Sequence, residues 1–567
     1  MKKRWAARPA PMLELSDAPR HGDLPASISL LLARRGFAGE RLRRFLAPEM
    51  VDLSDWKTIP GMEEAASRIA SAVGGSRKIL VHGDFDADGI TATTTVYLAL
   101  SKLGADVDYF IPDRFDDGYG LSEAGVKACA DTGAEMLLTV DCGISDTEHV
   151  AELRGLGVET VITDHHQPGD RIPEASAVVD PAMHGEAPWS RLSGVGVAWM
   201  AMRGVYRLLG EDIEYLRDLL QLVAVGTVAD VVELVDDNRI LVSQGLKLMR
   251  SRPLPGMAAL AGSASIETGA LTSTDIAYYI GPRLNACGRI GHARDAVELL
   301  LASDAEEARL LAAKVEGYNR QRRKLDKEVE EEVLARAAKL DGPRCIVMAD
   351  GGWHRGVIGI VASRLVRRYG VPSLMIAVED GTGYGSARSV PGIPIHSILR
   401  DIQAGSGIMS RLGGHPMAAG FSLPEENIDI LGEELREMMS GSEWDEHLGS
   451  VLYLDGRLEE SDFNAGTARA LEMLEPFGEG NRKPVWLARG AFPLNWRTVG
   501  KDHTHLSCSF RIGSGTYRAI GFNMAGRQSV LGGRVDLAFV LALDTWRNDG
   551  SVQLVLRDIR KHRGKEQ

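Results

Sequence analysis

Three short apolar runs in the first half of the chain end in acidic and histidine side chains. The residues concerned are His82, Asp84, Asp86 and Asp88 after KILV, Asp141 after MLLTV, and Asp164, His165 and His166 after TVIT. Carboxylates that lie close together repel one another and cannot all stay ionised without compensation. Oxygen ligands combined with imidazoles therefore predict a bound divalent metal, and the lack of Cys favours Mn²⁺ or Mg²⁺ over structural zinc. For any single Asp among them a helix cap is the more common role, but the combination of three strand ends favours the metal site.

The elements that must position these side chains alternate between strand and helix from Lys78 onward. The predicted strands are the runs KILVH, DVDYF, AEMLLTV, VETVIT and ASAVV. Runs rich in Val, Ile and Leu without polar alternation are typical of strands covered on both faces, which predicts a parallel, doubly wound sheet. Ligands bind outside the carboxyl ends of such strands, so we expect residues far apart in the sequence to meet there.

The rest of the chain predicts several further folding units. A helical lead-in is expected over 1–60, the domain carrying the acidic strand ends over 61–250, and a helical connector over 251–343. Within the connector, a capping box of Ser303 and Glu306 predicts a long helix that ends before DGP at 341–343. A second, smaller α/β domain is expected over 344–440, and alternating runs such as THLSCSFRI predict an all-β barrel over 450–567.

Composition excludes several classes of protein. The 567 residues include 65 Lys and Arg, 78 Asp and Glu and 44% apolar residues, which is typical of a globular protein with several cores and excludes a small binding module. No run approaches a membrane span and the first residues lack the apolar region of a signal peptide, so we expect a cytoplasmic protein without a membrane partner. The five scattered cysteines predict reduced, mostly buried thiols.

The motifs resemble those of a known family. VHGDFDADG, VDCG, TDHH and VGTVAD resemble the four motifs of the DHH phosphoesterase superfamily, with the spacing of its RecJ branch. IPDRFDDGYGLS, LSGVGVAW, IGPRLNACGRI, GSARSVPG and RLGGHPMAAGF also resemble RecJ segments in the same order, over roughly residues 78 to 425. The resemblance implies a DHH catalytic domain, a DHH-associated domain and a barrel of the oligonucleotide-binding (OB) fold. It further implies a single-strand-specific 5′-to-3′ exodeoxyribonuclease that releases 5′-mononucleotides in recombination and repair.

Carried over by position, the resemblance implies two metal ions, Mn²⁺ or Mg²⁺. One would be held by His82, Asp86 and Asp141, and the other by Asp88, Asp141, His165 and Asp230. Asp84 would stand behind the ligands or orient water, and His166 would lie beside the scissile phosphate. Two such ions can polarise a phosphoryl oxygen and lower the pKa of the attacking water. Neither a Ser, Cys or Thr nucleophile with a positioned base nor a GxxxxGK[ST] loop stands out, which favours hydrolysis over ATP-driven chemistry.

A second set of residues is expected to bind the end of the strand. GSARSVPG predicts a glycine-rich turn carrying Ser386 and Arg388, and a guanidinium fork beside backbone amides suits a terminal phosphate. The resemblance implies a 5′-phosphate pocket of Arg114, Ser386 and Arg388, with contributions from Arg283, Asn285 and Arg289. His415 in GGHPMAAG and His354 in GWHRGVIG are further candidates, although a turn histidine bonding its own backbone is an equally good interpretation.

The barrel is expected to bind unpaired bases, since OB folds stack bases on aromatic rings beside basic side chains. The candidates are Trp496, Arg497, Tyr517, Arg518, Trp546 and Arg547, and RQRRK at 320–324 is a basic candidate on the connector. Burial of these rings in the barrel core is the alternative. The family resemblance implies a monomer that acts on single-stranded DNA beside a helicase and a single-strand-binding protein.

Two other functions remain open at this point. The first is a DHH-family phosphodiesterase on short oligonucleotides or cyclic dinucleotides, whose members usually lack the long connector and the barrel. The second, from a different class, is a catalytically inactive replication scaffold, whose members have lost metal ligands. All six expected ligands are present in this sequence, which favours the enzyme.

Overall fold

The computed structural model describes residues 3–9, 24–544, 547 and 549–563. Two compact units make up the chain. The larger unit comprises Ala7–Leu284, Ala296–Ala312 and Tyr453–Gln567, and the smaller unit comprises Met1–Ala6, Asn285–Asp295 and Ala313–Leu452. The expected metal ligands all belong to the larger unit.

A five-stranded sheet forms the centre of the larger unit, and all its strands are parallel. In spatial order the strands are β3 (Val107–Phe110), β2 (Ile79–His82), β4 (Met136–Val140), β5 (Glu159–Thr163) and β6 (Ala177–Val179). The predicted doubly wound sheet is confirmed, and each predicted run forms a strand. The order reverses between β2 and β4, and such a switch point opens a crevice at the carboxyl ends of the strands.

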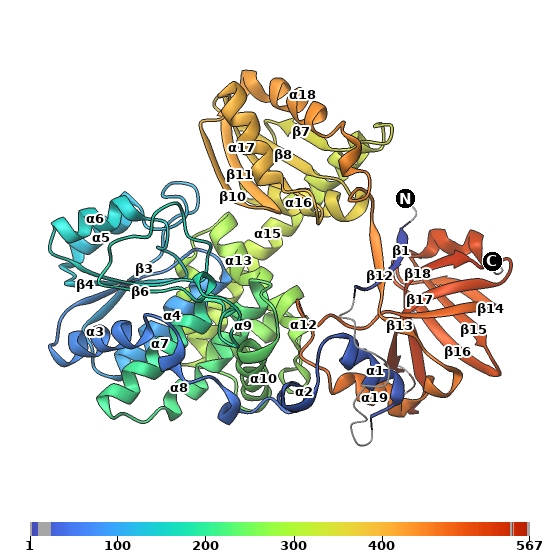
Figure 1. The fold of residues 1–567 in the computed structure, drawn as a ribbon, viewed down its shortest axis with the longest axis horizontal. Helices are drawn as coiled ribbons and strands as arrows, with labels where there is room; N and C mark the ends of the chain where they lie inside the picture. Colours follow the sequence, from blue (N-terminus) through green and yellow to red (C-terminus); the bar gives the residue numbers. More distant parts are fainter. Residues whose placement is uncertain (1–2, 10–23, 545–546, 548, 564–567) are drawn as a thin grey trace. The chain divides into compact units, whose positions relative to one another are not determined.

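Helices cover both faces of this sheet, as Figure 1 shows. On one face lie α5 (Glu123–Thr132) and α6 (Thr147–Gly155); on the other lie α3 (Met62–Gly74), α4 (Ala87–Lys102) and α7 (Gly194–Leu209). Behind α4 and α7 pack α9 (Leu220–Ala229) and α10 (Asp236–Ser251). The nine consecutive residues Leu220–Val228 of α9 are all buried. A helix that is covered on every side needs no polar stripe, and α9 has none.

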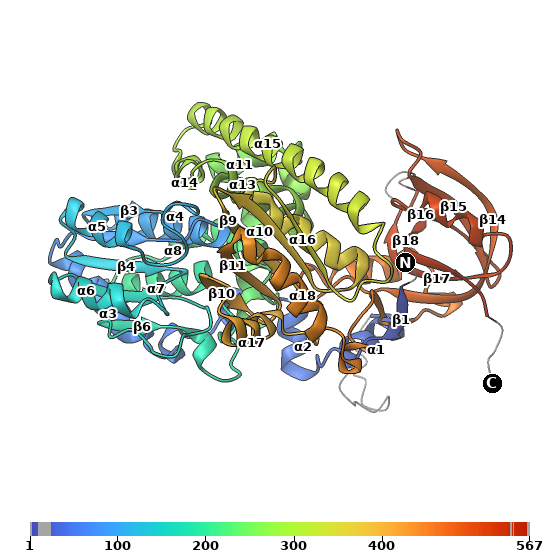
Figure 2. The same cartoon turned by 90° about the horizontal axis from the view of Figure 1, so that it is seen from above.

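Shorter helices and the connector complete this part of the chain. They are α1 (Ala26–Arg34), α2 (Gly39–Leu46), α8 (Glu214–Asp218), α11 (Pro255–Ser263), α12 (Ser273–Asp275), a π-helix (Ile276–Ile280), α13 (Gly281–Ile290), α14 (Arg294–Leu301) and α15 (Ala305–Ala337). The predicted long helix is confirmed as α15, seen along its length in Figure 2. Its cap is Asp304 rather than Ser303, since the Asp304 carboxylate accepts from the Glu306 and Glu307 amides. Among the described residues, no helix combines the length and apolar character that crossing a bilayer requires.

The smaller unit contains a mixed five-stranded sheet. In spatial order its strands are β10 (Arg411–His415), β11 (Ala418–Pro424), β9 (Thr382–Arg388), β8 (Ser373–Glu379) and β7 (Ile346–Asp350), with helices α16 (Arg355–Tyr369), α17 (Ile395–Ser406) and α18 (Ile428–Met438). The predicted turn at GSARSVPG is wrong in part, because Ser386 and Arg388 lie within β9. The glycine there serves packing: a Cβ on Gly385 would lie 2.0 Å from the Phe421 ring.

The predicted barrel is confirmed. Its strands are β13 (Gly456–Arg457), β14 (Trp486–Val499), β15 (His505–Ile512), β16 (Gly515–Gly521), β17 (Val535–Leu543) and β18 (Val552–Lys561), with α19 (Ala465–Glu472) packed against β17. Pairing of β14 with β17 closes the sheet. Leu506, Cys508 and Phe510 point into the core, as their alternation predicts. A separate two-stranded ribbon pairs β1 (Arg4–Ala7) with β12 (Val451–Leu454), so the lead-in is not wholly helical. All five cysteines are buried and none of them forms a disulfide bond, as expected.

Candidate metal centre

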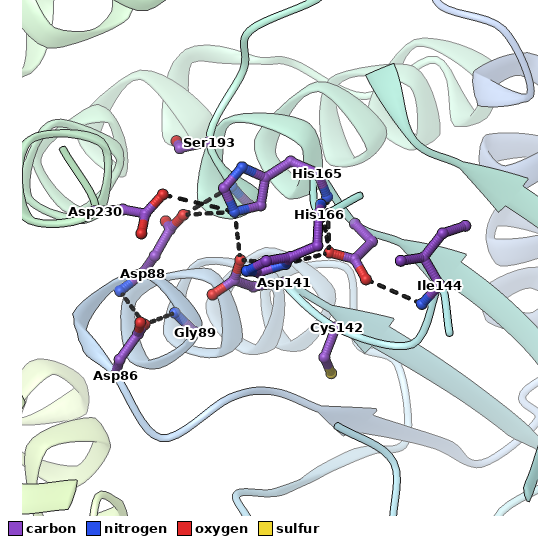
Figure 3. Close-up of polar contacts among 12 residues, drawn as sticks. Asp86, Asp88, Gly89, Asp141, Cys142, Ile144, His165, His166, Ser193 and Asp230 are labelled. Atoms are coloured by element: carbon purple, nitrogen blue, oxygen red, sulfur yellow. Dashed lines mark hydrogen bonds and ion pairs between the residues drawn. The ribbon is translucent and has the colours of Figure 1, made fainter. Parts of the chain in front are cut away.

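The crevice at the carboxyl ends of β2, β4 and β5 gathers the acidic side chains, and α9 contributes one more (Figure 3). His165 Nε2 lies 3.0 Å from Asp141 Oδ1, 3.8 Å from Asp88 Oδ2 and 3.7 Å from Asp230 Oδ2. Asp141 follows β4, Asp88 lies in the first turn of α4, and Asp230 ends α9. The predicted convergence of remote segments is therefore present.

Three overlapping groups in this crevice have the spacing of metal ligands. In each, one ligand atom per residue lies within 4.8 Å of the others: Asp84, Asp86 and Asp141; Asp88, His165 and Asp230; and Asp141, His165 and His166. Asp141 belongs to two of the three groups. Asp84 Oδ1 is buried and accepts no hydrogen bond from the described residues. Hard oxygen donors with imidazole suit Mn²⁺ or Mg²⁺, so the donor set fits the expected cofactor.

Two glycines allow the carboxylates to approach the helices this closely. A Cβ on Gly194, at the start of α7, would lie 2.2 Å from Asp141 Oδ1, and one on Gly226, in α9, would lie 2.6 Å from Asp88 Oδ1. The amides of Gly194 and Val195 donate to Asp88 over 2.8 and 3.0 Å. The N-terminus of α7 thus holds Asp88 in place through its amides and its dipole. Any side chain at Gly194 or Gly226 would displace a ligand.

The pKa values of these acids reflect the concentration of negative charge. Burial, followed by the charge of Asp86, raises the pKa of Asp84 to about 8 and that of Asp88 to about 7. Burial, followed by the charge of Asp88, raises the pKa of Asp141 and of Asp230 well above their ordinary value. Carboxylates held this close destabilise the protein when ionised, and a divalent cation among them relieves both the repulsion and the lost hydration.

The three groups include Asp84 and do not include His82, whose role as a metal ligand stays a prediction. His82 is in none of the three groups: its Nδ1 lies 3.6 Å from Cys142 Sγ, and a Cβ on Gly125 would lie 2.7 Å from its Nε2. Burial lowers the pKa of His82 to about 4, so the ring is neutral. Asp84, expected behind the ligands, instead shares a group with Asp86 and Asp141. Asp86 also caps α4 by accepting from the Asp88 and Gly89 amides, so the capping interpretation holds for this residue beside the ligand geometry.

A network of hydrogen bonds orients His166. Its Nδ1 lies 2.8 Å from Asp164 Oδ1, and Asp164 also accepts from the Ile144 amide at 3.0 Å. Burial lowers the pKa of His166, but the hydrogen bond and charge of Asp164 outweigh it and raise the pKa to about 9. The Tyr119 hydroxyl lies 3.0 Å from the same Nδ1.

Sequence reasoning missed Tyr119. The signal was its position between Gly118 and Gly120, which both adopt φ near +85°. Such a turn presents the intervening side chain at the end of a loop. Arg114, on the same segment, lies 4.1 Å above the Phe85 ring, and burial lowers its pKa while the charges of Asp84 and Asp86 raise it. A guanidinium therefore stands beside the acidic cluster.

In the smaller unit, Ser386 and Arg388 lie together at the end of β9. Arg388 Nη1 donates to Ser386 Oγ at 3.0 Å, and a Cβ on Gly359 of α16 would lie 2.8 Å from that oxygen and 3.1 Å from Arg388 Nη2. His354 caps α16 by accepting from the Gly356 amide at 3.0 Å. Arg289 of α13 donates to the Gly356 carbonyl at 3.1 Å. A serine, an arginine and the first turns of a helix thus lie side by side, a combination suited to an anion.

The remaining candidates are dispersed. Asn285 lies in α13, and His415 is the exposed last residue of β10, paired with Ala418, rather than a turn residue. Arg283 donates to the Tyr279 and Ser263 carbonyls. In the barrel, Tyr517 packs on the Phe463 ring and Arg518 pairs with Asp544 at 2.9 Å, whereas Trp496 is 42% exposed and Arg497 is exposed. Arg547 is exposed, and Trp546 lies outside the described residues.

The sheet, the acidic crevice and the barrel define a metal-dependent phosphoesterase. Family models match along the chain: DHH family, N-terminal domain at residues 78–227; DHHA1 domain at 342–441; and RecJ OB domain at 454–558. A curated relative, the single-stranded-DNA-specific exonuclease RecJ of Dickeya dadantii, is 36% identical over 577 residues, covering 97% of this chain and 98% of its own. The chain belongs to the RecJ family.

Solved structures agree with this relationship. The crystal structure of Thermus thermophilus RecJ in complex with Mn²⁺ has a TM-score of 0.85 and 30% identity, covering 99% of this chain and 80% of that chain. The Mg²⁺ complex of the same protein has a TM-score of 0.79 and 29% identity, covering 99% of this chain and 79% of that chain. This relative therefore binds both of the cations that suit the donor set.

Proposed function

We propose that this protein is a metal-dependent exonuclease that hydrolyses single-stranded DNA from its 5′ end and releases 5′-mononucleotides during recombination and repair. The proposal depends on the position of Asp141. Its carboxylate belongs to two groups of acids and histidines whose ligand atoms have the spacing required to hold a metal ion. Family membership over nearly the whole chain supports the same function.

In this proposal the two cation sites are Asp84, Asp86 and Asp141 on one side, and Asp88, His165 and Asp230 on the other, with Asp141 between them. Divalent cations bound there would polarise a phosphoryl oxygen and lower the pKa of the attacking water. The protein's own groups orient the reactants: Asp164 holds the His166 ring through a 2.8 Å contact with its Nδ1, and His166 would lie beside the scissile phosphate. His82 supports the crevice from behind, packed against Cys142.

The end of the strand is proposed to bind in the smaller unit, at Ser386 and Arg388. A 5′-phosphate carries up to two negative charges, and a hydroxyl beside a guanidinium and a helix N-terminus provides both donors and positive potential for it. Asn285, Arg289 and His354 lie on the elements that frame these two residues or the start of α16. Recognition of the terminal phosphate would give cleavage in steps from the end rather than in the middle of a strand.

Replacing Arg388 with Ala should reduce kcat/KM on a 5′-phosphorylated strand about 100-fold, because a charge-assisted, forked contact to phosphate is lost. The same change should affect a 5′-hydroxyl strand less than about five-fold. Initial rates on the two otherwise identical oligonucleotides measure the difference. Arg400→Ala, at an exposed position of α17, is the control. An equal loss on both substrates would exclude the phosphate role.

The barrel is proposed to hold the strand through exposed rings and cations, of which Trp496 and Arg497 on β14 remain candidates. Tyr517 and Arg518 are engaged within the barrel, so we do not assign them this role. Because hydrolysis requires an unpaired end, we also propose that a helicase supplies the substrate and that a single-strand-binding protein shares it. We propose a monomer acting in the cytoplasm.

Digestion of end-labelled oligonucleotides tests the function. With Mn²⁺ or Mg²⁺, a 5′-labelled single strand should release labelled mononucleotide at the earliest times, while a 3′-labelled strand shortens progressively. Blunt duplex and RNA should be cut far more slowly, and chelator should stop the reaction. Early internal fragments, equal cutting of duplex, or turnover restricted to cyclic dinucleotides would exclude the proposal.

Neither alternative function is favoured by an observation. The RecJ OB domain and the connector helix are both present, unlike in the small-substrate relatives expected from the sequence. The acidic groups are assembled in the crevice, which removes the expected basis for an inactive scaffold.

A further inference from the structure

An exposed aromatic pair lies on the π-helix Ile276–Ile280 of the larger unit. Tyr278 is 72% exposed and Tyr279 is 48% exposed, while Ile276 and Ile280 are fully buried and fix the turn to the core. Short π-helices are rare and are frequently found at functional sites. With 72% and 48% of their surfaces exposed, these two adjacent tyrosines form an uncovered aromatic patch, and such patches mark interaction sites.

This π-helix packs against the end of α9 that carries Asp230. A Cβ on Gly281, the residue after the π-helix, would lie 2.9 Å from the Ala229 Cβ, and Ala229 directly precedes Asp230. The next residue, Val231, adopts φ +64° with 63% of its side chain exposed. A β-branched residue in this region of backbone space is strained, and such strain gathers at binding and catalytic sites.

The position of the aromatic pair is held from behind. The Arg283 guanidinium donates to the Tyr279 carbonyl at 2.8 Å and to the Ser263 carbonyl at 3.4 Å, and the side chain is 6% exposed. The family resemblance implied that Arg283 contributes to the 5′-phosphate pocket; in the structure its guanidinium contacts the backbone of the π-helix and of α11. A preorganised pair of rings loses little entropy when it binds a flat ligand.

We propose that Tyr278 and Tyr279 form a stacking platform for the unpaired bases of the strand next to the scissile linkage. The inference rests on the proposed function. It identifies a contact through which the protein would prefer unpaired bases to paired bases. Val231 and the two rings carry no charge, so the face of a base is the part of a nucleotide that fits them. Every base has such a face, and a paired base does not expose it, which gives binding that tolerates any sequence and requires a single strand.

The test compares Tyr278→Ala/Tyr279→Ala with Tyr278→Phe/Tyr279→Phe in the full chain, on 5′-phosphorylated single-stranded oligonucleotides with Mn²⁺. The alanine pair should raise KM about ten-fold with kcat changed less than about two-fold, because a base–ring stack is lost while the chemistry is intact. The phenylalanine pair retains the rings and should match the wild type. Leu156→Ala, which removes a 58% exposed apolar side chain after α6, is the control for loss of surface area.

Substrates with one abasic position, scanned along the first several nucleotides, locate the contact. At one or two positions the missing base should weaken binding to the wild type and leave the alanine pair unaffected. An unchanged KM for the alanine pair, or equal sensitivity of both proteins at every position, would overturn the platform. Equilibrium binding in chelator is measured in parallel, so a protein that binds through these rings but releases no nucleotide would refute the exonuclease and keep the platform.

Discussion

Replacing Asp141 with Asn should reduce the rate of nucleotide release about 10³-fold or more at saturating Mn²⁺. The Asp141 carboxylate shares ligand spacing with Asp84 and Asp86 and also with His165 and His166, so one substitution weakens both groups. Asn has nearly the same volume and tolerates φ +64°, the backbone conformation of residue 141, so the crevice should keep its shape. Single-turnover digestion of a 5′-labelled strand measures the loss.

Two further measurements separate a lost ligand from a damaged fold. Without divalent cations, Asp141→Asn should melt at a higher temperature than the wild type, because one of several repelling carboxylates is gone. Addition of Mn²⁺ should raise the melting temperature of the wild type more than that of the variant. Asp131→Asn, at an exposed position of α5, should change neither value. A variant with normal turnover would exclude Asp141 as the shared ligand, and binding of single strands in chelator should stay within about three-fold.

The sheet and the meeting of its strand ends were predictable because both follow from local patterns. The runs before His82, Asp141 and Asp164 are buried on both faces, which is visible as unbroken apolar sequence. Parallel strands bring their carboxyl ends to one edge whatever the intervening loops do. The same reasoning correctly predicted β15 of the barrel, because buried residues alternate with more exposed residues along this strand.

What the sequence did not reveal depends on contacts between remote segments. Gly385 indicated a turn, yet it is there because the Phe421 ring occupies the place of a side chain. His82 was expected to be a metal ligand. The sequence did not reveal that its ring lies close to Cys142 and Gly125. Tyr517 was a candidate for stacking until Phe463, more than fifty residues earlier, was seen to pack against it. Residue type and spacing predict which groups converge, whereas packing decides which way each one faces.

Packing between remote segments also decides the environment of Arg239. This environment predicts that replacing Arg239 strongly lowers the stability of the protein. Its sequence context, DDNRIL, is typical of a solvated helix face, yet the side chain is 1% exposed. The guanidinium donates to the Phe45 carbonyl at 2.7 Å and to the Glu475 carbonyl at 2.7 Å, as well as to the carbonyls of Leu474 and Pro476. It also lies 3.8 Å above the Phe45 ring. One side chain of α10 thus joins α2 to the segment that leads from α19 into the barrel.

Arg239→Ala should lower the free energy of unfolding by about 3–5 kcal/mol, because it leaves a cavity and several buried carbonyls without a donor. Burial already lowers the pKa of Arg239 to about 9, which shows that the charge itself is costly there and that the stabilisation comes from the hydrogen bonds and the ring contact. Denaturant unfolding followed by tryptophan fluorescence measures the change. Arg44→Ala, on the neighbouring α2 with its side chain 46% exposed and ion-paired to Glu40, should cost less than about 1 kcal/mol. Equal stability of the two variants would mean that α2 and the barrel segment are held by apolar packing alone.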